Sequence, residues 1–473
     1  MAIVRQVLFF AVAATALAIG ASLALGGVPH VPDEASYLLQ ARLFADGLRV
    51  GPAGAAAELM DWPLWQHDPA ASVFPIGWSL LLAPWAALGL ERLANPLFAG
   101  LLPILGYLAL KERLQEREAR FAALALAVMP GVSTLAGSLM AHTSVFAALL
   151  GALAVGLRSR DGPGWSLMAG IGLGYVVLAR PFDATLMAGP LALWMAWRRP
   201  RMAWTLAPVL AAGALVLADN AWMTGSPARF LASVELELDQ PGCNRLGFGE
   251  SVGCNGEGYT PADAMRNGLI SLERMERLIL GLPGGGLAVL AGATMGRRRL
   301  LFTLPWLVVP VLGYALYWSP GAAYGARFYH PGQLALAACV GVVMARWRVA
   351  PLIFGAAVLA GQGLVLQDLS RSYFCADPAI AQATNGLSGT VFLQTRGERS
   401  SWHPTLRLQM VCGPHMGHSP ILAAHDPSGE GLQIVRMPTD ESRWQTLLEQ
   451  LPAPIWVVDH QVDRQEVDVF QVK

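Results

Sequence analysis

The sequence predicts an all-α polytopic membrane protein, with about 10–12 transmembrane helices and a small α/β domain at its C-terminal end. Of its 473 residues, 54% are hydrophobic and only 14% are charged, and the mean hydropathy is +0.44. Soluble domains carry about 25% charged residues, so much of this surface must face lipid. The apolar residues also gather in segments of about 20, which is the length of a helix that spans the hydrocarbon core.

The apolar segments lie before residue 368. The first, 7–27, is longer than the core of a signal peptide and has no convincing cleavage site, so we expect a membrane anchor. The others follow in chain order and are expected to be helices: 73–90, 94–110, 121–137, 138–157, 165–179, 183–197, 202–219, 278–296, 300–318, 332–345 and 350–368.

Arginines in short loops predict the orientation, because cytoplasmic loops are enriched in basic residues. The clusters expected in the cytoplasm are Arg158 with Arg160, Arg198-Arg199 with Arg201, Arg297-Arg298-Arg299, and Arg346 with Arg348. Segments 28–72, 220–277 and 319–331 then face outward, together with the tail. We therefore expect a multi-pass protein of the inner (plasma) membrane whose C-terminal domain is periplasmic or extracellular.

Four of the five cysteines lie in the predicted outer segments, which predicts two disulfides. Cys243 and Cys254 flank a Gly- and Asn-rich loop, and Cys375 and Cys412 lie in the polar tail. Disulfides persist in oxidising compartments, so this placement agrees with the predicted orientation; free thiols are the alternative. Cys339 falls inside an apolar helix and is expected to be a small core residue.

The chain is predicted to divide at about residue 368. Residues 1–368 form the helical membrane body, and residues 369–473 have the composition of a soluble domain. Segments 390–394, 433–436 and 454–459 are rich in β-branched and aromatic residues and predict strands. Residues 441–451 have the periodicity of an amphipathic helix.

The most informative motif follows the first apolar segment, where Asp33 and Glu34 are adjacent. Ionised side chains at a membrane surface are costly unless they have a partner or a function. On a helix that starts near Pro32, Asp33 and Tyr37 share a face, and Arg42 follows. A carboxylate beside an aromatic ring and a cation suits deprotonation of a hydroxyl group. The alternative is a helix cap, because acidic residues favour the first turn.

Other polar residues interrupt apolar stretches. His67 and Asp68 lie among tryptophans and prolines, which indicate either membrane-interface anchors or the lining of a polar pocket. Arg180 and Asp183 are either functional or two charges that neutralise each other. His142, at a helix start, is more typical of a satisfied polar contact than of catalysis.

A second cluster comprises Tyr324, Arg327, Tyr329 and His330 at the outer membrane face. An arginine among tyrosines is well suited to bind a lipid phosphate.

Composition and missing motifs exclude several partners. The formal net charge is zero, which removes the electrostatic case for nucleic acid. There is no Walker loop and no Gly-rich dinucleotide motif between a strand and a helix, so we do not expect a nucleotide donor. The tail histidines have no regular ligand spacing and predict no metal site: His403, His415, His418 and His425.

In their order along the chain, these motifs resemble the GT-C superfamily of polytopic glycosyltransferases, in particular bacterial relatives of protein O-mannosyltransferases and of the aminoarabinose transferase that acts on lipid A. The resemblance covers nearly all of 1–368. The motifs that carry it are Asp33-Glu34 with Tyr37, Phe74-Pro75-Ile76-Gly77-Trp78, Arg180-Pro181, the segment 220–227, Gly247-Phe248-Gly249, and Tyr324-Gly325-Ala326-Arg327-Phe328-Tyr329.

The resemblance implies transfer of a sugar from a polyprenyl-phosphate donor to a lipid, glycan or protein acceptor on the outer face, with inversion. Asp33 would be the catalytic base, and Glu34 would support it or bind the acceptor. Arg327, with Arg180 or Arg42, would hold the leaving phosphate. The remaining substrate-binding candidates are Tyr37, His67, Asp68, His142, Tyr324, Tyr329 and His330.

The chain departs from the aminoarabinose transferases at one position. They place a phosphate-binding lysine before the next helix, where this chain has Val73-Phe74. Either an arginine or His67 takes its place, or the donor binds in a different position. Some members of the superfamily bind a divalent metal ion and others do not, and the sequence leaves this cofactor open.

Two other functions stay open. A glycan ligase or polymerase also acts on polyprenyl-linked sugars, but is expected to depend on arginines and a histidine in a large outer loop. A lipid or ion-coupled transporter would more often show inverted repeats and charges at the bilayer midplane, whereas the polar clusters here gather at one face.

Overall fold

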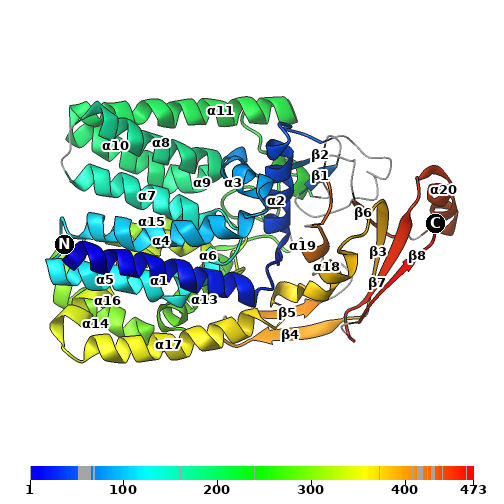
Figure 1. The fold of residues 1–473 in the computed structure, drawn as a ribbon. Helices are drawn as coiled ribbons and strands as arrows, with labels where there is room; N and C mark the ends of the chain where they lie inside the picture. Colours follow the sequence, from blue (N-terminus) through cyan, green and yellow to red (C-terminus); the bar gives the residue numbers. More distant parts are fainter. Residues whose placement is uncertain are drawn as a thin grey trace.

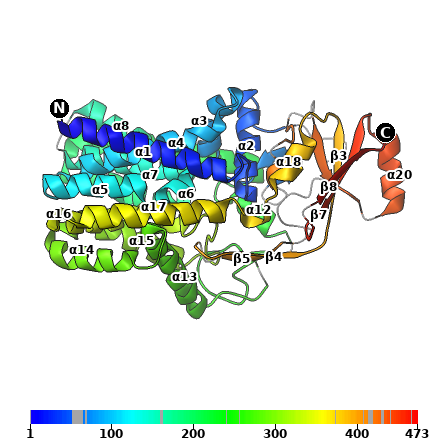
Figure 2. The ribbon, with the colours of Figure 1, turned by 60° about the horizontal axis from the view of Figure 1, so that its bottom comes forward.

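The structure is a computed structural model that describes residues 2–51, 65–67, 70–158, 162–238, 240–254, 256–371, 373–405, 408–412, 419–422, 424–427, 432–438, 440–464 and 466–473. The long helices lie side by side in one bundle, and the C-terminal sheet lies beyond one end of it (Figure 1). The view in Figure 2 shows the same division. The N-terminus lies at the opposite end of the bundle from the sheet (Figure 1).

The first half of the chain contributes helices α1 to α11. Their bounds are α1 Ala2–Ala24, α2 Pro32–Ala45, α3 Ile76–Ala87, α4 Glu91–Leu110, α5 Glu116–Val128, α6 Pro130–Ala136, α7 His142–Leu157, α8 Pro163–Ala179, α9 Pro181–Asp183, a π-helical turn Ala184–Ala188, α10 Gly189–Arg198, a 3₁₀ segment Pro200–Thr205 and α11 Leu206–Thr224.

The second half contributes the remaining helices. They are α12 Leu231–Leu236, α13 Pro261–Leu280, α14 Gly285–Leu300, α15 Leu304–Tyr314, a 3₁₀ segment Arg327–Gly332, α16 Gln333–Arg346, α17 Ala350–Leu369, a 3₁₀ turn Tyr373–Cys375, α18 Pro378–Thr384, α19 Ser419–Leu422 and α20 Glu441–Gln450.

All of the predicted apolar segments fold as helices, although several are too short for a full span. Within the described residues, five helices are long and apolar enough to cross a membrane, or up to seven if two bent pairs each count as one span. The pair α5–α6 bends by 46° at Pro130, and α13–α14 bends by 91° where Gly281 and Gly284 adopt positive φ. Four further apolar helices have 10–17 residues: α3, α7, α8 and α15.

The C-terminal part forms a four-stranded sheet in the order β6-β3-β7-β8. Strand β3 (Thr390–Arg396) pairs in parallel with β6 (Gln433–Arg436) and β7 (Ile455–Gln461), and β8 (Glu466–Gln471) pairs antiparallel with β7. These strands and α20 confirm the predicted strands and helix. Two hairpins were not predicted: β1–β2 (Trp65–His67, Ala70–Ser72) and β4–β5 (Arg399–His403, Leu408–Cys412).

Both predicted disulfides are present. Cys243 is bonded to Cys254, with 4.8 Å between their Cα atoms, and Cys375 to Cys412, with 5.4 Å. Cys339 is a buried free thiol, as expected.

Helix α2 connects the bundle to the sheet. It runs across the end of the bundle, between the long helices and the C-terminal strands (Figure 1). Its Ala35, Leu39 and Leu43 share one hydrophobic core with β3, β6 and β7, whereas Tyr37 and Leu38 belong to the core of the bundle. The packing therefore crosses the boundary predicted at residue 368.

We predict that Leu43→Ala destabilises the protein, because Leu43 is fully buried in the core shared by α2 and the sheet. Its free energy of unfolding should fall by about 2–5 kcal/mol. Thermal unfolding in detergent measures this change. The matched control is Leu48→Ala, since Leu48 is 40% exposed. Equal melting temperatures for the two variants would contradict the shared core.

Candidate active site

The site is built on the first turn of α2. Pro32 occupies the first helical position, where its missing N–H costs nothing. The Glu34 carboxylate accepts hydrogen bonds from the backbone N–H groups of Val31 (3.2 Å) and His30 (2.8 Å). Glu34 therefore caps its own helix, as the alternative interpretation of the Asp33-Glu34 motif predicts. Asp33 takes no part in the cap.

Glu34 also receives two donors from distant segments. The backbone N–H of Leu139, between α6 and α7, donates to it at 2.7 Å, and the hydroxyl of Tyr324 donates to its other oxygen. The Glu34 side chain is completely buried. Burial and the Glu34 carboxylate raise the pKa of Tyr324 well above its ordinary value, so the phenol stays protonated and donates. Both Glu34 oxygens are thus occupied by protein donors.

The segment around Tyr324 is held by the start of the tail. Tyr324 has a φ of 57°, a left-handed conformation that is costly for a tyrosine. Its backbone N–H donates to the hydroxyl of Tyr373 at 2.5 Å. The ring nitrogens of His30 lie 2.7 Å from the Tyr373 carbonyl and 2.6 Å from that of Leu25. Tyr373 therefore joins both segments that carry partners of Glu34.

The connection between α6 and α7 is fixed from three helices. Besides the bond from Leu139 to Glu34, the indole N–H of Trp78 on α3 donates to the Leu139 carbonyl at 2.6 Å. The side-chain amide of Asn95 on α4 donates to the carbonyls of Ser138 and Met140, both at 2.7 Å. The Met140 sulfur lies 3.9 Å from Arg327 Nη1. This connection thus forms a rigid support beside Arg327.

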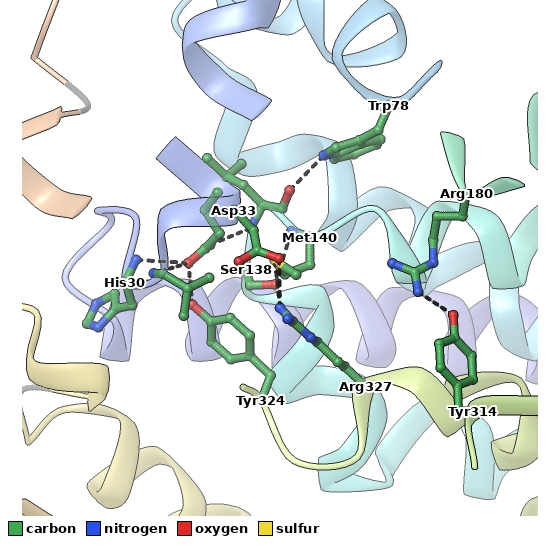
Figure 3. Close-up of polar contacts among 12 residues, drawn as sticks. His30, Asp33, Trp78, Ser138, Met140, Arg180, Tyr314, Tyr324 and Arg327 are labelled. Carbon is green, nitrogen blue, oxygen red and sulfur yellow. Dashed lines mark hydrogen bonds and ion pairs between the residues drawn. The ribbon is translucent and has the colours of Figure 1, made fainter. Parts of the chain in front are cut away.

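Asp33 faces Arg327 at the edge of a cavity of about 420 Å³. Asp33 Oδ1 lies 3.1 Å from Arg327 Nη1, and their side chains are 15% and 13% exposed. Figure 3 shows this pair, with Tyr324 on one side and Arg180 with Tyr314 on the other. Asp33 is therefore the carboxylate of the motif that a ligand can reach.

Arg180 brings a second guanidinium to the same cavity. It pairs with Asp183 and donates to the Tyr314 hydroxyl at 2.7 Å, and that hydroxyl donates to Asp183 at 2.5 Å. Arg180 and Arg327 lie 5.7 and 5.3 Å from the centre of the Phe328 ring. Arg180 and Asp183 do neutralise each other, and Arg180 still lines the cavity.

The structure brings some predicted residues to the cavity and places others elsewhere. Asp33, Tyr37, Arg180 and Arg327 line it. Arg42 donates to the His425 carbonyl at 3.3 Å, on the side of the tail. Four further candidates are buried and are not among the lining residues: His142, Tyr324, Tyr329 and His330. The side chain of His67 lies outside the described residues, as do Arg160, Asp68, His415 and His418.

Several lining residues were not predicted. Tyr314, Tyr317 and Phe328 form the aromatic wall beside the two arginines, and Ser233 and Asn244 come from the segment between α11 and α13. Asn244 follows Cys243 directly and precedes Gly247-Phe248-Gly249, so the predicted disulfide and this motif were signals that this part of the loop has a defined place.

The described residues do not fit a metal site. They contain no group of three or more His, Cys, Asp or Glu side chains that could hold an ion. Beside Asp33 the structure places a guanidinium instead of further anionic ligands. In the tail, His403 contacts the Asp368 carbonyl at 3.1 Å, and His425 accepts from the Ile434 N–H at 3.1 Å. Both histidines have structural contacts.

Solved structures share this architecture. ArnT from Cupriavidus metallidurans, in the apo state, aligns with 97% of this chain and 94% of its own length, at 14% identity and a TM-score of 0.58. The same protein bound to undecaprenyl phosphate covers 96% and 92%, with a TM-score of 0.57. The chain has a GT-C fold. An Archaeoglobus fulgidus oligosaccharyltransferase in the apo form covers 96% of this chain and 69% of its own, at 14% identity and a TM-score of 0.46. No family model and no curated protein sequence matches the chain.

We predict that Glu34→Gln destabilises this GT-C fold. The amide replaces one acceptor oxygen with an NH₂ group that would face N–H or O–H donors. Hydrogen bonds to a charged group contribute about 1.5–3 kcal/mol each, so the free energy of unfolding should fall by about 3 kcal/mol. Denaturant or thermal unfolding measures it.

The control for this prediction is the adjacent change Asp33→Asn, which removes one partly exposed ion pair. Because Asp33 loses one charged partner whereas Glu34 has four donors, it should lower the free energy of unfolding by less than Glu34→Gln does. If Glu34→Gln proved no less stable than Asp33→Asn, the structural role of Glu34 would have to be abandoned.

Proposed function

We propose that this protein transfers a sugar from a polyprenyl-phosphate donor to an acceptor on the outer face of the plasma membrane. One observation carries the proposal: a ligand-accessible carboxylate, Asp33, and two guanidinium groups, Arg180 and Arg327, line one cavity at one end of the helical bundle. The C. metallidurans ArnT fold, solved with undecaprenyl phosphate, supports a lipid-linked donor. The acceptor in this chemistry is a lipid, glycan or protein that presents a hydroxyl group.

Asp33 acts as the general base. It takes the proton from the acceptor hydroxyl as the oxygen attacks the anomeric carbon of the donor sugar. The bond from that carbon to the phosphate oxygen breaks, and its electron pair stays on the phosphate. Attack from the side opposite the phosphate inverts the anomeric configuration. The proton passes from Asp33 to solvent after the product leaves.

Arg327 and Arg180 stabilise the charge that develops on the leaving phosphate. Preorganised cations aimed at a developing charge provide large transition-state stabilisation in a site shielded from water. In the structure Arg327 is paired with Asp33, so an incoming phosphate competes with the carboxylate for the guanidinium. Donor binding thereby releases Asp33 to accept a proton.

Glu34 positions the site and does not touch the substrate in this proposal. It holds the first turn of α2, the support formed by Leu139 and the segment of Tyr324 that leads to Arg327. Of the two roles expected for Glu34, support of Asp33 and binding of the acceptor, the proposal takes the first, because protein donors occupy both oxygens.

The orientation is also part of the proposal. Helices α7 and α16 start beside the site; Arg158 follows the end of α7 directly, and Arg346 is the last residue of α16. Basic residues favour the cytoplasmic side, so the site and the tail (369–473) face outward. The two disulfides support an oxidising compartment for that side.

Asp33→Asn should reduce the turnover number (kcat) of sugar transfer by about 10²–10⁴-fold, the usual contribution of a general base. Purified protein in detergent, undecaprenyl-phosphate sugars and a membrane extract as acceptor provide the assay. The control is Asp46→Asn, at the exposed C-terminal end of the same helix. Wild-type turnover in the Asp33 variant would rule Asp33 out as the base.

Arg327→Gln should weaken the binding of undecaprenyl phosphate by about 10- to 100-fold, which corresponds to the loss of a charge-assisted hydrogen bond. Equilibrium binding of the labelled lipid phosphate to purified protein measures it. Arg266→Gln is the matched control, because the Arg266 side chain is 70% exposed on α13. Equal affinities in both variants would show that Arg327 does not hold the phosphate.

A further inference from the structure

The wall of the cavity contributed by the outer segment contains two neutral polar side chains. Ser233, on α12, and Asn244 line it together with Phe230, Ala232 and Leu246. Helix α12 lies at the end of the bundle that faces the tail (Figure 2). The other polar lining groups include Asp33, Arg180 and Arg327, which the proposed chemistry already uses. Ser233 and Asn244 have no part in that chemistry.

The amide of Asn244 is held in a defined orientation. The indole N–H of Trp318 donates to Asn244 Oδ1 at 3.1 Å. The amide nitrogen then points toward the Ser233 hydroxyl, at 3.4 Å. An amide nitrogen carries two N–H donors and a hydroxyl can donate and accept, so this pair has capacity for further hydrogen bonds with a ligand.

The backbone around Asn244 is also held in place, by a disulfide and by backbone hydrogen bonds. Cys243 is fully buried and bonded to Cys254, and its carbonyl accepts the Gly253 N–H at 2.7 Å. On the other side, the Gly247 N–H donates to the Leu316 carbonyl at 2.8 Å. The loop is thereby attached to the segment that carries Trp318. Because this loop is already ordered, little conformational entropy is lost when a ligand binds, which favours specific recognition.

We infer that Asn244, with Ser233, recognises hydroxyl groups of the transferred sugar and selects a neutral sugar over an amino sugar; this rests on the proposed function. Amide and hydroxyl groups match neutral hydroxyls. An ammonium group on the sugar would lack an anionic partner on this wall, because the described residues that form it are all uncharged. An unpaired charge taken out of water is costly.

The test compares two donors, undecaprenyl phosphate linked to a neutral hexose and undecaprenyl phosphate linked to an amino sugar. Transfer is measured for wild type, Asn244→Ala, Asn244→Asp and the control Arg245→Ala, an exposed neighbour that does not line the cavity. Binding of undecaprenyl phosphate without a sugar is measured in parallel. Thermal unfolding and detection of the Cys243–Cys254 bond check that each variant folds.

We expect wild type to prefer the hexose donor. Asn244→Ala should lower kcat/KM for that donor by about tenfold, the usual effect of one lost neutral hydrogen bond. It should leave the affinity for undecaprenyl phosphate unchanged. Asn244→Asp should shift the preference toward the amino sugar, because it adds the missing anion. Arg245→Ala should behave as wild type.

Two results would overturn the inference while the proposed function stands. One is a wild-type protein that transfers the amino sugar more efficiently than the hexose. The other is an unchanged ratio of the two kcat/KM values in folded Asn244→Ala and Asn244→Asp. Failure of wild type to transfer either sugar, or to bind undecaprenyl phosphate, would instead overturn the proposed function and this inference with it.

Discussion

The arrangement of the site depends on one buried carboxylate, that of Glu34. A fully buried charge is tolerated only where donors surround it, and removing its partners is strongly destabilising. Here four donors come from three separate parts of the chain: the start of α2, the α6–α7 connection and the segment before Arg327. Arg92 of α4 adds a favourable electrostatic interaction. The hydrogen bonds to the Glu34 carboxylate bring together the segments that carry Asp33, Met140 and Arg327.

Asp33 and Glu34 are adjacent in the sequence, but their different surroundings give them different roles. Asp33 points to the cavity and meets one guanidinium, so a substrate can reach it. The Glu34 side chain does not line the cavity, and both of its oxygens accept hydrogen bonds from the protein itself. The tail takes part in the same arrangement, because Tyr373 contacts both His30 and Tyr324, and one face of α2 packs into the core of the sheet. The C-terminal domain thus helps to place the helix that carries Asp33.

Local patterns in the sequence predicted much of this structure. Hydropathy located the helices, β-branched runs located β3, β6 and β7, and the cysteines predicted both disulfides. The resemblance also implied that Arg327, with Arg180 or Arg42, lies at the site of Asp33, and Arg327 and Arg180 line the same cavity as Asp33. For Glu34 it left two roles open, support of Asp33 and binding of the acceptor, since two of the donors to Glu34 come from residues about 100 and 290 positions away. Asn244 and the packing of α2 on the sheet were missed for the same reason. They depend on long-range contacts that leave no periodic pattern.

The most direct test of the account is the anomeric configuration of the product, determined by NMR after transfer of a sugar from a donor of known configuration. A single displacement, with Asp33 as the base and the lipid phosphate as the leaving group, predicts a product of opposite configuration. Retention would require a second displacement through a covalent or rearranged intermediate. That result would contradict the role assigned to Asp33.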